Sequence, residues 1–353
     1  MGISTLDREG IDRDGHEAAA VLARARQSVN PVLRSAVASL PGSMRRIAGY
    51  HFGWLDSDGA PASGDSGKAI RPALVLAAAQ ALGGPHAAQG AVRAAAAVEL
   101  VHNFTLLHDD VIDRDPTRRH RPTAWSVFGG ADAILAGDAM QALALRVLAE
   151  DEHPAAARAA SRLAACVIEL CDGQHADCDF EHRDDVSLSE CLAMAEAKTG
   201  ALLGCACAVG ALYAQAPADA VEAMDAFGRQ VGLAFQLIDD LIGIWGDPQV
   251  TGKPVGADLA ARKKSLPVVA ALRSGTPAGA ELARIYGADE PLTAADLHSA
   301  AESIDRAGGR DWAQMQACDR MAGAIGHLSG AIPDGVRAGE LLALAELVTR
   351  RSH

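Results

Sequence analysis

Alanine is the commonest apolar residue of this chain, and alanine-rich stretches recur along most of its length. Only 4% of the residues are aromatic, although 49% are hydrophobic. Alanine favours helices more than any other amino acid does, whereas strands are enriched in β-branched and aromatic residues. Few segments alternate polar and apolar residues with the period of two that marks a half-buried strand. The chain is therefore predicted to be all-α.

Glycine and proline separate the predicted helices. Residues 1–15 are polar and acidic and are predicted to form a disordered tail, and residues 16–353 to form a single domain. The stretch Asp56–Gly67 is rich in Gly, Ser and Asp and is predicted to be a loop. The predicted helices cover residues 16–27, 68–83, 86–113, 129–150, 154–177, 187–213, 217–246 and 258–274, one begins near Pro31, and weaker ones cover 293–307, 311–329 and 333–351.

Charge and termini restrict the class of protein. The net charge of −13 is unfavourable for binding nucleic acid, which needs a basic surface. Residues 1–15 lack the basic start and apolar run of a signal peptide, and no stretch approaches the ~20 apolar residues of a membrane span. The seven cysteines are an odd number without zinc-site spacing, which favours free thiols. We expect a cytoplasmic protein without a membrane span.

The segment Val98–Asp113 carries a few polar groups on an otherwise apolar helix. The polar residues that follow one another at spacings of three, four and four, and so share one stripe, are His102, Thr105, Asp109 and Asp113. A helix that is apolar nearly all round is usually buried. The polar stripe is therefore predicted to line an internal cavity.

Two pairs of aspartates end apolar helical runs. The first belongs to a D-D-x-x-D motif of Asp109, Asp110 and Asp113, and the second is Asp239-Asp240. Burying unpaired carboxylates is costly, and a hard cation with oxygen ligands, such as Mg²⁺, removes that cost. A solvated acidic helix end would give the same pattern for either pair alone. Two pairs that face each other are predicted to hold several Mg²⁺ ions around one diphosphate.

Basic residues lie shortly before or after both acidic motifs. These residues are Lys68, Arg71, Arg118, Arg119, Arg121, Lys253, Lys263 and Lys264. Any one of these residues, taken by itself, could equally be an ordinary lysine or arginine on the protein surface. Arginine can form two parallel hydrogen bonds to phosphate oxygens. The repeated placement of cations beside the acidic motifs therefore predicts the binding of diphosphate groups.

Five motifs occur in one order between Gly67 and Pro267. They are GKAIRP, HNFTLLHDDVID with a following RR, AKTG, FQLIDD, and GKPVGAD with a following KKSLP. In these motifs the chain resembles the trans-isoprenyl diphosphate synthases, or polyprenyl synthetases. The resemblance implies one large helical bundle around a central apolar cavity, the isoprenoid synthase fold. It also implies a homodimeric, Mg²⁺-dependent enzyme that joins isopentenyl diphosphate to an allylic diphosphate.

The resemblance implies a role for each matching position. Mg²⁺ bridging to the allylic diphosphate would be held by Asp109, Asp110, Asp113, Asp239 and Asp240. The allylic diphosphate itself would be contacted by Arg118, Lys198 and Lys253. The diphosphate of isopentenyl diphosphate would be bound by Lys68, Arg71, His102 and Arg119, and Lys263 is also assigned to substrate binding. Oxygens would be directed toward the developing allylic cation by Thr199 and Gln236.

The chain departs from the family pattern in two places. The second motif of the family is usually D-D-x-x-D, but Gly243 stands at its last position here. Asp247 lies one turn further on and is a candidate to help through a water molecule. In GKAIRP, Ala69 stands where a second basic residue is usual. Because the first motif is complete, we still expect an active enzyme.

The residues just before the first aspartate motif shape the floor of the product tunnel in this family. Here Phe104 and Thr105 lie five and four residues before Asp109. A bulky ring followed by a smaller residue resembles the members that form geranylgeranyl diphosphate. Plain core packing of Phe104 would give the same pattern. The predicted product has twenty carbons, and farnesyl diphosphate is the alternative.

Two other functions on the same fold are considered. A terpene cyclase needs only one diphosphate site, so the basic set of Lys68, Arg71 and His102 counts against it. A non-catalytic partner subunit is compatible with the incomplete second motif, but the complete first motif counts against it.

Overall fold

The computed structural model describes residues 5–64, 67–246, 256–288 and 290–349, except the side chains of residues 5–15 and 257. Most of the described chain is helical and only two short strands are present in it, which confirms the all-α prediction. The chain divides into two compact units. One consists of Met1–Val167, Cys205–Asp225 and Ser329–Leu344, and the other of Ile168–Gly204, Ala226–Leu328 and Ala345–His353. The single domain over residues 16–353 stays a prediction.

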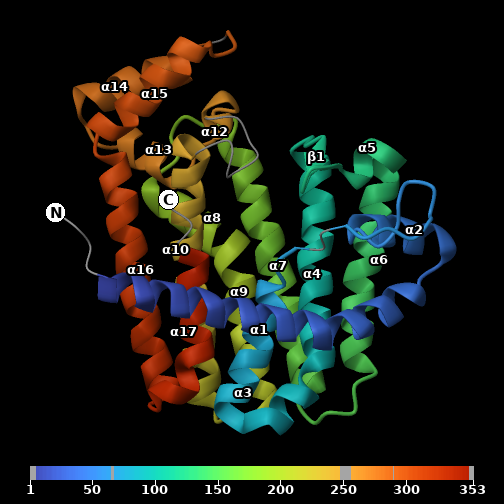
Figure 1. Ribbon diagram of the computed structural model, residues 1–353. Coiled ribbons are helices and arrows are strands. Elements are labelled where there is room, and N and C mark those ends of the chain that lie inside the picture. Colours follow the sequence, from blue (N-terminus) through green and yellow to red (C-terminus); the bar gives the residue numbers. More distant parts are fainter. Residues whose placement is uncertain (1–4, 65–66, 247–255, 289, 350–353) are drawn as a thin grey trace. The chain divides into compact units, whose positions relative to one another are not determined.

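Helix α4 lies at the centre of the first part of the chain. The helices around it are α1 (Thr5–Ala38), α2 (Gly42–His51), α3 (Ile70–Gly90), α5 (Ala124–Phe128) and α6 (Gly130–Ala149). α4 (Val92–Ile112) packs against α6, α3 and α1 (Figure 1). Four consecutive alanines of α4, residues 94–97, are fully buried. Their small side chains let the neighbouring helices approach closely.

The N-terminal helices differ from the prediction. Pro31 lies inside α1 instead of starting a new helix. The reason is a continuous apolar face: Val29, Leu33 and Val37 are buried at helical spacing, whereas Pro31 is exposed on the opposite side. α1 begins at Thr5, so the predicted disordered tail of residues 1–15 overlaps its start, and the disorder stays a prediction. α2 and α5 were not predicted.

The predicted break between α3 and α4 is present in part. Gly84 has a φ of 76°, which kinks α3 at the expected Gly-Gly-Pro sequence. α4 begins only at Val92. It is followed by a short hairpin that was not predicted, in which β1 (Thr117–Arg118) pairs antiparallel with β2 (Arg121–Pro122).

Long helices also form most of the second part of the chain. They are α7 (Ala156–Phe180), α8 (Leu188–Ala195), the π-helical turn η1 (Glu196–Gly200), α9 (Ala201–Tyr213) and α10 (Ala218–Trp245). Leu233, Leu237 and Leu241 of α10 form a buried cluster with Phe180 and Leu266. These bounds agree closely with the predicted segments 154–177, 187–213 and 217–246.

The C-terminal part consists of shorter helices. They are α12 (Ala257–Ala260), α13 (Leu266–Leu272), α14 (Pro277–Tyr286), α15 (Ala294–Arg306), α16 (Gly309–Ala331) and α17 (Gly335–Thr349). The predicted helix 258–274 is divided between α12 and α13. α14 was not predicted, although Thr276 caps it and Pro277 starts it, as is usual at helix N-termini.

One stretch, Leu188–Tyr213, is long and apolar enough to cross a membrane, with a mean hydropathy of 1.4 in its most apolar window. Of that window, 67% is buried inside the protein. Buried core helices meet the same two criteria, so this stretch is weak evidence for a membrane span.

Candidate active site

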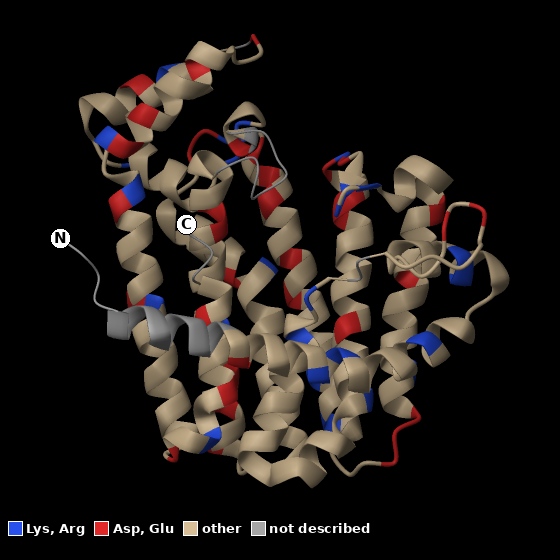
Figure 2. Cartoon of the chain, viewed as in Figure 1, with Lys and Arg blue, Asp and Glu red and all other residues tan. Residues whose placement is uncertain are grey.

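The first aspartate motif lies at the C-terminal end of α4, beside the hairpin. Figure 2 shows acidic and basic residues together at this end of the helix. Asp110 is only 1% exposed. Nε and Nη2 of Arg118 both donate to its Oδ1 at 2.7 Å. Asp109 is half-buried, and Asp113 is exposed at the end of the helix.

The second oxygen of Asp110 is an unusual atom. Asp110 Oδ2 is buried and has no hydrogen-bond partner among the described residues. Burial raises the pKa of this carboxyl group from 3.8 to about 6, although Arg118 opposes the shift. A buried carboxylate oxygen without a partner is costly in a folded protein. It is therefore a ready ligand for a cation.

The hairpin presents two arginines on a strained turn. Arg119 and His120 join β1 to β2 and have φ values of 51° and 60°. Positive φ at both central residues matches the two-residue hairpin turn that glycine or asparagine usually occupies. Strain of this kind, of order 1–3 kcal/mol per residue, is often kept at functional sites. The turn fixes the position of Arg118 and Arg119 next to α4.

Gly67 brings the GKAIRP segment to the hairpin. A Cβ atom at Gly67 would lie 2.5 Å from Nη2 and 2.9 Å from Cζ of Arg119. Its φ of 96° also favours glycine. Lys68 follows directly and is exposed. The glycine of this motif therefore leaves room for the Arg119 guanidinium.

Arg71 and His102 meet behind this segment. Nη1 of Arg71 lies 3.1 Å from Nε2 of His102. Burial lowers the pKa of Arg71 to about 10 and also lowers the pKa of His102, with Arg71 and Arg119 as further causes for the histidine. For Arg71, Glu99 opposes the effect of burial. The structure thus brings together three of the residues predicted to bind isopentenyl diphosphate, Arg71, His102 and Arg119.

A buried chain of hydrogen bonds that was not predicted from the sequence lies beside His102 on α4. Nδ2 of Asn103 donates to the backbone oxygen of Glu99 at 2.8 Å and to its Oε1 at 3.1 Å. Oδ1 of Asn103 lies 3.1 Å from Nε2 of His51. His51 belongs to α2, a helix that was not predicted, so no pattern in the sequence connected it with α4.

Glu99 supplies a prediction about stability. It is 4% exposed, and burial raises its pKa from 4.5 to about 7, against the effect of Arg71. Since the folded protein favours the protonated form, its stabilising effect is complete below pH 4.5 and is lost as the pH rises through 7. Glu99→Gln should therefore raise Tm at pH 8.5, by about 2 °C or more, and leave it unchanged at pH 4.5. The exposed Glu152→Gln is the control, and an equal effect of Glu99→Gln at both pH values would contradict the shift.

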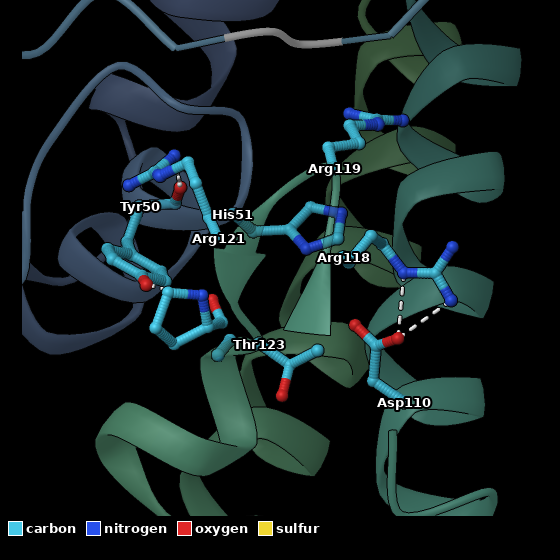
Figure 3. A pocket seen from close by; sticks show the side chains of 9 residues that line it. Tyr50, His51, Asp110, Arg118, Arg119, Arg121 and Thr123 are labelled. Carbon is cyan, nitrogen blue, oxygen red and sulfur yellow. Dashed lines mark hydrogen bonds and ion pairs between the residues drawn. The ribbon is translucent and has the colours of Figure 1, made fainter. Parts of the chain in front are cut away.

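A polar pocket lies between the end of α2, the end of α4 and the hairpin. It is lined by Tyr50, His51, Asp110, Arg118, Arg119, Arg121, Pro122, Thr123 and Ala124 (Figure 3). Arg121 was grouped with the phosphate-binding cations, but its guanidinium donates to the backbone oxygens of Tyr50 and Leu55, at 3.2 Å each. It also lies over the Tyr50 ring, 4.5 Å from the centroid. Arg121 thus anchors the segment that carries His51.

The second aspartate pair lies at the end of α10. Asp239 is exposed, whereas Asp240 is 8% exposed and accepts hydrogen bonds at both oxygens. Gln236 Nε2 donates to Oδ1 at 2.7 Å, and the Leu266 backbone N–H donates to Oδ2 at 2.9 Å. Burial raises the pKa of Asp240 to about 7. In both pairs, then, the second aspartate is buried and held while the first is more accessible.

Thr199 and Gln236 lie in contact with each other. The Thr199 hydroxyl donates to Oε1 of Gln236 at 2.7 Å. A close approach of η1 to α10 makes this possible, because a Cβ at Gly232 would lie 2.7 Å from Cα of Gly200. Lys198, on the same π-helical turn, has its Nζ 2.5 Å from Oδ2 of Asp177. π-helical turns are frequent at functional sites.

The space beside Gly243 is filled by another carboxylate. A Cβ atom at Gly243 would lie 2.0 Å from Oδ2 and 2.9 Å from Cγ of Asp258. Asp258 also contributes to the raised pKa of Asp240. Asp247, the residue first considered as a substitute, lies outside the described residues, as does Lys253. No pattern in the sequence pairs Gly243 with Asp258, because the two residues are 15 positions apart and lie on different helices.

The two lysines of KKSLP differ in their surroundings. Lys264 is largely buried, and its Nζ donates to the backbone oxygens of Phe180 (2.9 Å) and Arg183. It therefore connects the α7–α8 loop to the start of α13. Lys263 is half-buried, and its assignment to substrate binding stays a prediction.

Comparisons with known proteins agree with these observations. Residues 60–304 match the polyprenyl synthetase family. The chain is 50% identical over 333 residues to a geranylgeranyl diphosphate synthase of Mycobacterium tuberculosis, covering 94% of this chain and 93% of the other. It is 47% identical over 346 residues to a (2E,6E)-farnesyl diphosphate synthase of Mycobacterium bovis, covering 96% and 95%.

A solved structure gives the same result for the fold. A polyprenyl synthetase from Streptomyces coelicolor A3(2) superposes with a TM-score of 0.88 at 47% identity, covering 93% of this chain and 98% of the other. The all-α isoprenoid synthase fold implied by the resemblance is thereby confirmed. The chain belongs to the polyprenyl synthetase family.

Proposed function

We propose that this chain is a Mg²⁺-dependent prenyltransferase that condenses isopentenyl diphosphate with an allylic diphosphate to form geranylgeranyl diphosphate. One observation carries the proposal. Half-buried arginines of the hairpin, Arg118, Arg119 and Arg121, gather beside a carboxylate, Asp110, that has one oxygen without a partner among the described residues. Such a site suits a ligand with several negative charges that brings its own cation. The two relatives named above make products of this class.

The residues present fit Mg²⁺. Among the described residues, no three His, Cys, Asp or Glu side chains are arranged to hold a metal ion by themselves. Mg²⁺, however, usually takes only one or two carboxylates and completes its shell with water and substrate phosphates. Asp109, Asp110 and Asp113 would supply such ligands, and Oδ2 of Asp110 is the oxygen that lacks a partner. When bound, Mg²⁺ neutralises the diphosphate and makes it a better leaving group.

The second aspartate pair would also hold Mg²⁺. Asp239 and Asp240 are its expected ligands. We further propose that Asp258 supplies the third carboxylate that Gly243 lacks, because its side chain occupies the position of a side chain at residue 243. The missing aspartate of the motif is in this way replaced from α12.

The remaining residues bind and orient the substrates. Arg118 and Lys198 would hold the allylic diphosphate, and Lys68, Arg71, His102 and Arg119 the isopentenyl diphosphate. The bond from the allylic carbon to its diphosphate breaks, the isopentenyl double bond attacks that carbon, and a proton leaves to the released diphosphate. Oxygens of Thr199 and Gln236 would stabilise the allylic cation. The protein contributes position and charge.

Phe104 gives a test of product length. It is 4% exposed on α4, and its ring meets the His108 ring edge-on at 5.5 Å. Phe104→Ala should yield prenyl diphosphates longer than twenty carbons, because the removed ring opens space along the helix. Chromatography of the hydrolysed products measures this. Because such a truncation costs roughly 3–5 kcal/mol of stability, Phe104→Leu is made as a milder variant and Phe227→Leu as a buried control. Unchanged product length in both Phe104 variants would refute the assignment.

A product assay tests the proposed function. The purified chain with Mg²⁺ and isopentenyl diphosphate is offered dimethylallyl, geranyl and farnesyl diphosphates separately. Geranylgeranyl diphosphate from each is the expected product, and farnesyl diphosphate as the end product would support the alternative. A hydrocarbon formed from geranylgeranyl diphosphate alone would indicate a cyclase. Turnover only with a second protein would indicate a partner subunit. We also propose that the enzyme is a cytoplasmic homodimer, as expected for the family.

A further inference from the structure

His51 stands at the edge of the polar pocket, outside the set of residues that the family motifs assign. It is the last residue of α2 and is half-buried. Its ring lies near Arg118 and Arg119 in the pocket (Figure 3). Arg121 holds the backbone on either side of it, at Tyr50 and Leu55. The histidine is therefore fixed where a diphosphate bound to these arginines would lie.

The hydrogen-bond chain decides which face of the ring is available. Both donor bonds of the Asn103 amide nitrogen go to Glu99, so Oδ1 of Asn103 must accept from Nε2–H of His51. The neutral ring then carries no proton on Nδ1. Among the described residues, no hydrogen bond engages this second nitrogen. Asn103 thus orients the ring and leaves Nδ1 for a ligand in the pocket.

The charges around His51 are those of an anion site. Guanidinium groups of the hairpin, Arg118, Arg119 and Arg121, act on it, and burial together with these cations lowers its pKa to about 3. From α4, Asp110 lines the same pocket, and His102 is close enough for the two rings to interact electrostatically. A diphosphate in the pocket would offset the guanidinium charges. A proton would then be shared between Nδ1 and a phosphate oxygen.

We propose that His51 is a further ligand for the diphosphate of isopentenyl diphosphate, which it contacts through Nδ1 beside Arg119 and His102. This inference rests on the proposed function for the identity of the substrate. It assigns to α2 a direct part in substrate binding.

Two substitutions separate the two nitrogens of the ring. The amide nitrogen of glutamine in His51→Gln takes the place of Nε2, so the bond to Asn103 is kept and the Nδ1 contact is lost. His51→Asn places an amide near Nδ1 and loses the bond to Asn103. A hydrogen bond to a charged group contributes about 1.5–3 kcal/mol, which corresponds to roughly 10- to 100-fold in affinity. His153→Gln is the control, since His153 lies in the α6–α7 loop and does not line the pocket.

Binding is measured by calorimetry with isopentenyl diphosphate alone, and steady-state kinetics follow with both substrates. His51→Gln should weaken isopentenyl diphosphate binding and raise its KM by roughly 10- to 100-fold. Its Tm and the KM for the allylic substrate should stay near those of the unaltered protein. We expect the unaltered protein to take up protons on binding, measured by comparing calorimetry in buffers of different ionisation enthalpy. His51→Gln should take up fewer protons. His51→Asn should have a lower Tm and retain more of the affinity.

Wild-type affinity in His51→Gln would overturn the proposal. A lower Tm with an equal rise of both KM values would overturn it as well, because it would show that His51 only supports the fold. Because calorimetry measures binding without turnover, the role of His51 and the prenyltransferase function are tested independently. A chain that binds isopentenyl diphosphate but makes no prenyl product would refute the proposed function and leave the binding test of His51 intact.

Discussion

Asp110→Asn should abolish most of the prenyltransferase activity while the protein stays folded. The substitution removes the negative charge of a carboxylate whose buried Oδ2 has no partner among the described residues. If that oxygen binds Mg²⁺, its loss should lower kcat/KM by about 10³-fold, or about 4 kcal/mol of transition-state stabilisation. Asparagine has nearly the same shape, so the packing around α4 should remain.

Stability should move in the opposite direction to activity. Burial raises the pKa of Asp110 to about 6, so keeping it ionised at neutral pH costs folding free energy. Because the folded protein favours the protonated carboxyl group, Asp110 contributes most to the free energy of unfolding below pH 3.8. This contribution is lost as the pH rises through 6. Asp110→Asn should therefore keep or raise Tm at pH 8.

The matched control is Asp138→Asn on α6. Asp138 is exposed and lies 3.7 Å from Nε2 of His108, so its loss should change neither activity nor Tm appreciably. Activity is measured as a function of Mg²⁺ concentration in all three proteins. Near-normal kcat/KM in Asp110→Asn, with an unchanged Mg²⁺ requirement, would exclude this carboxylate as a ligand.

The part of the site that could be predicted from the sequence lies within single helices. The stripe of His102, Asp109 and Asp113 follows from periodicity along α4 and its C-cap alone. The spacing along one helix fixes which side chains share a face. The predicted bounds of α7, α10 and α15 are correct to within a few residues for the same reason.

Features that depend on contacts between distant segments could not be predicted. His51 lies on α2, which packs against α6, and it reaches α4 through its hydrogen bond with Asn103. Arg121 resembles its neighbours in the sequence, but its guanidinium is engaged by the backbone oxygens of Tyr50 and Leu55. Pro31 suggested a helix start, and the buried apolar face of α1 overrode it. In each case tertiary packing outweighs the local conformational preference of the sequence.

Gly243→Asp, which restores the usual family motif, should impair the enzyme. A Cβ atom there would lie 2.0 Å from Oδ2 of Asp258, so the new side chain must displace that carboxylate. Two like charges would then compete for one position, beside Asp239 and Asp240. We expect kcat/KM to fall by roughly 10- to 100-fold, since each tenfold step corresponds to about 1.4 kcal/mol. Gly243→Ala, which displaces the carboxylate without adding charge, should have a smaller effect in the same direction.

The double variant Gly243→Asp/Asp258→Ala tests whether an aspartate at position 243 can replace the carboxylate of Asp258, or whether the new side chain only crowds the site. Asp258→Ala alone should also lower kcat/KM and raise the Mg²⁺ concentration needed for half-maximal activity. If one carboxylate in this space is what the site requires, Gly243→Asp with Asp258→Ala should recover much of the activity that each single change removes. That result is a strong positive coupling in a double-mutant cycle, as expected for residues that share one position. Additive losses would show instead that Asp258 and residue 243 act independently, and that this chain works with two carboxylates in its second motif.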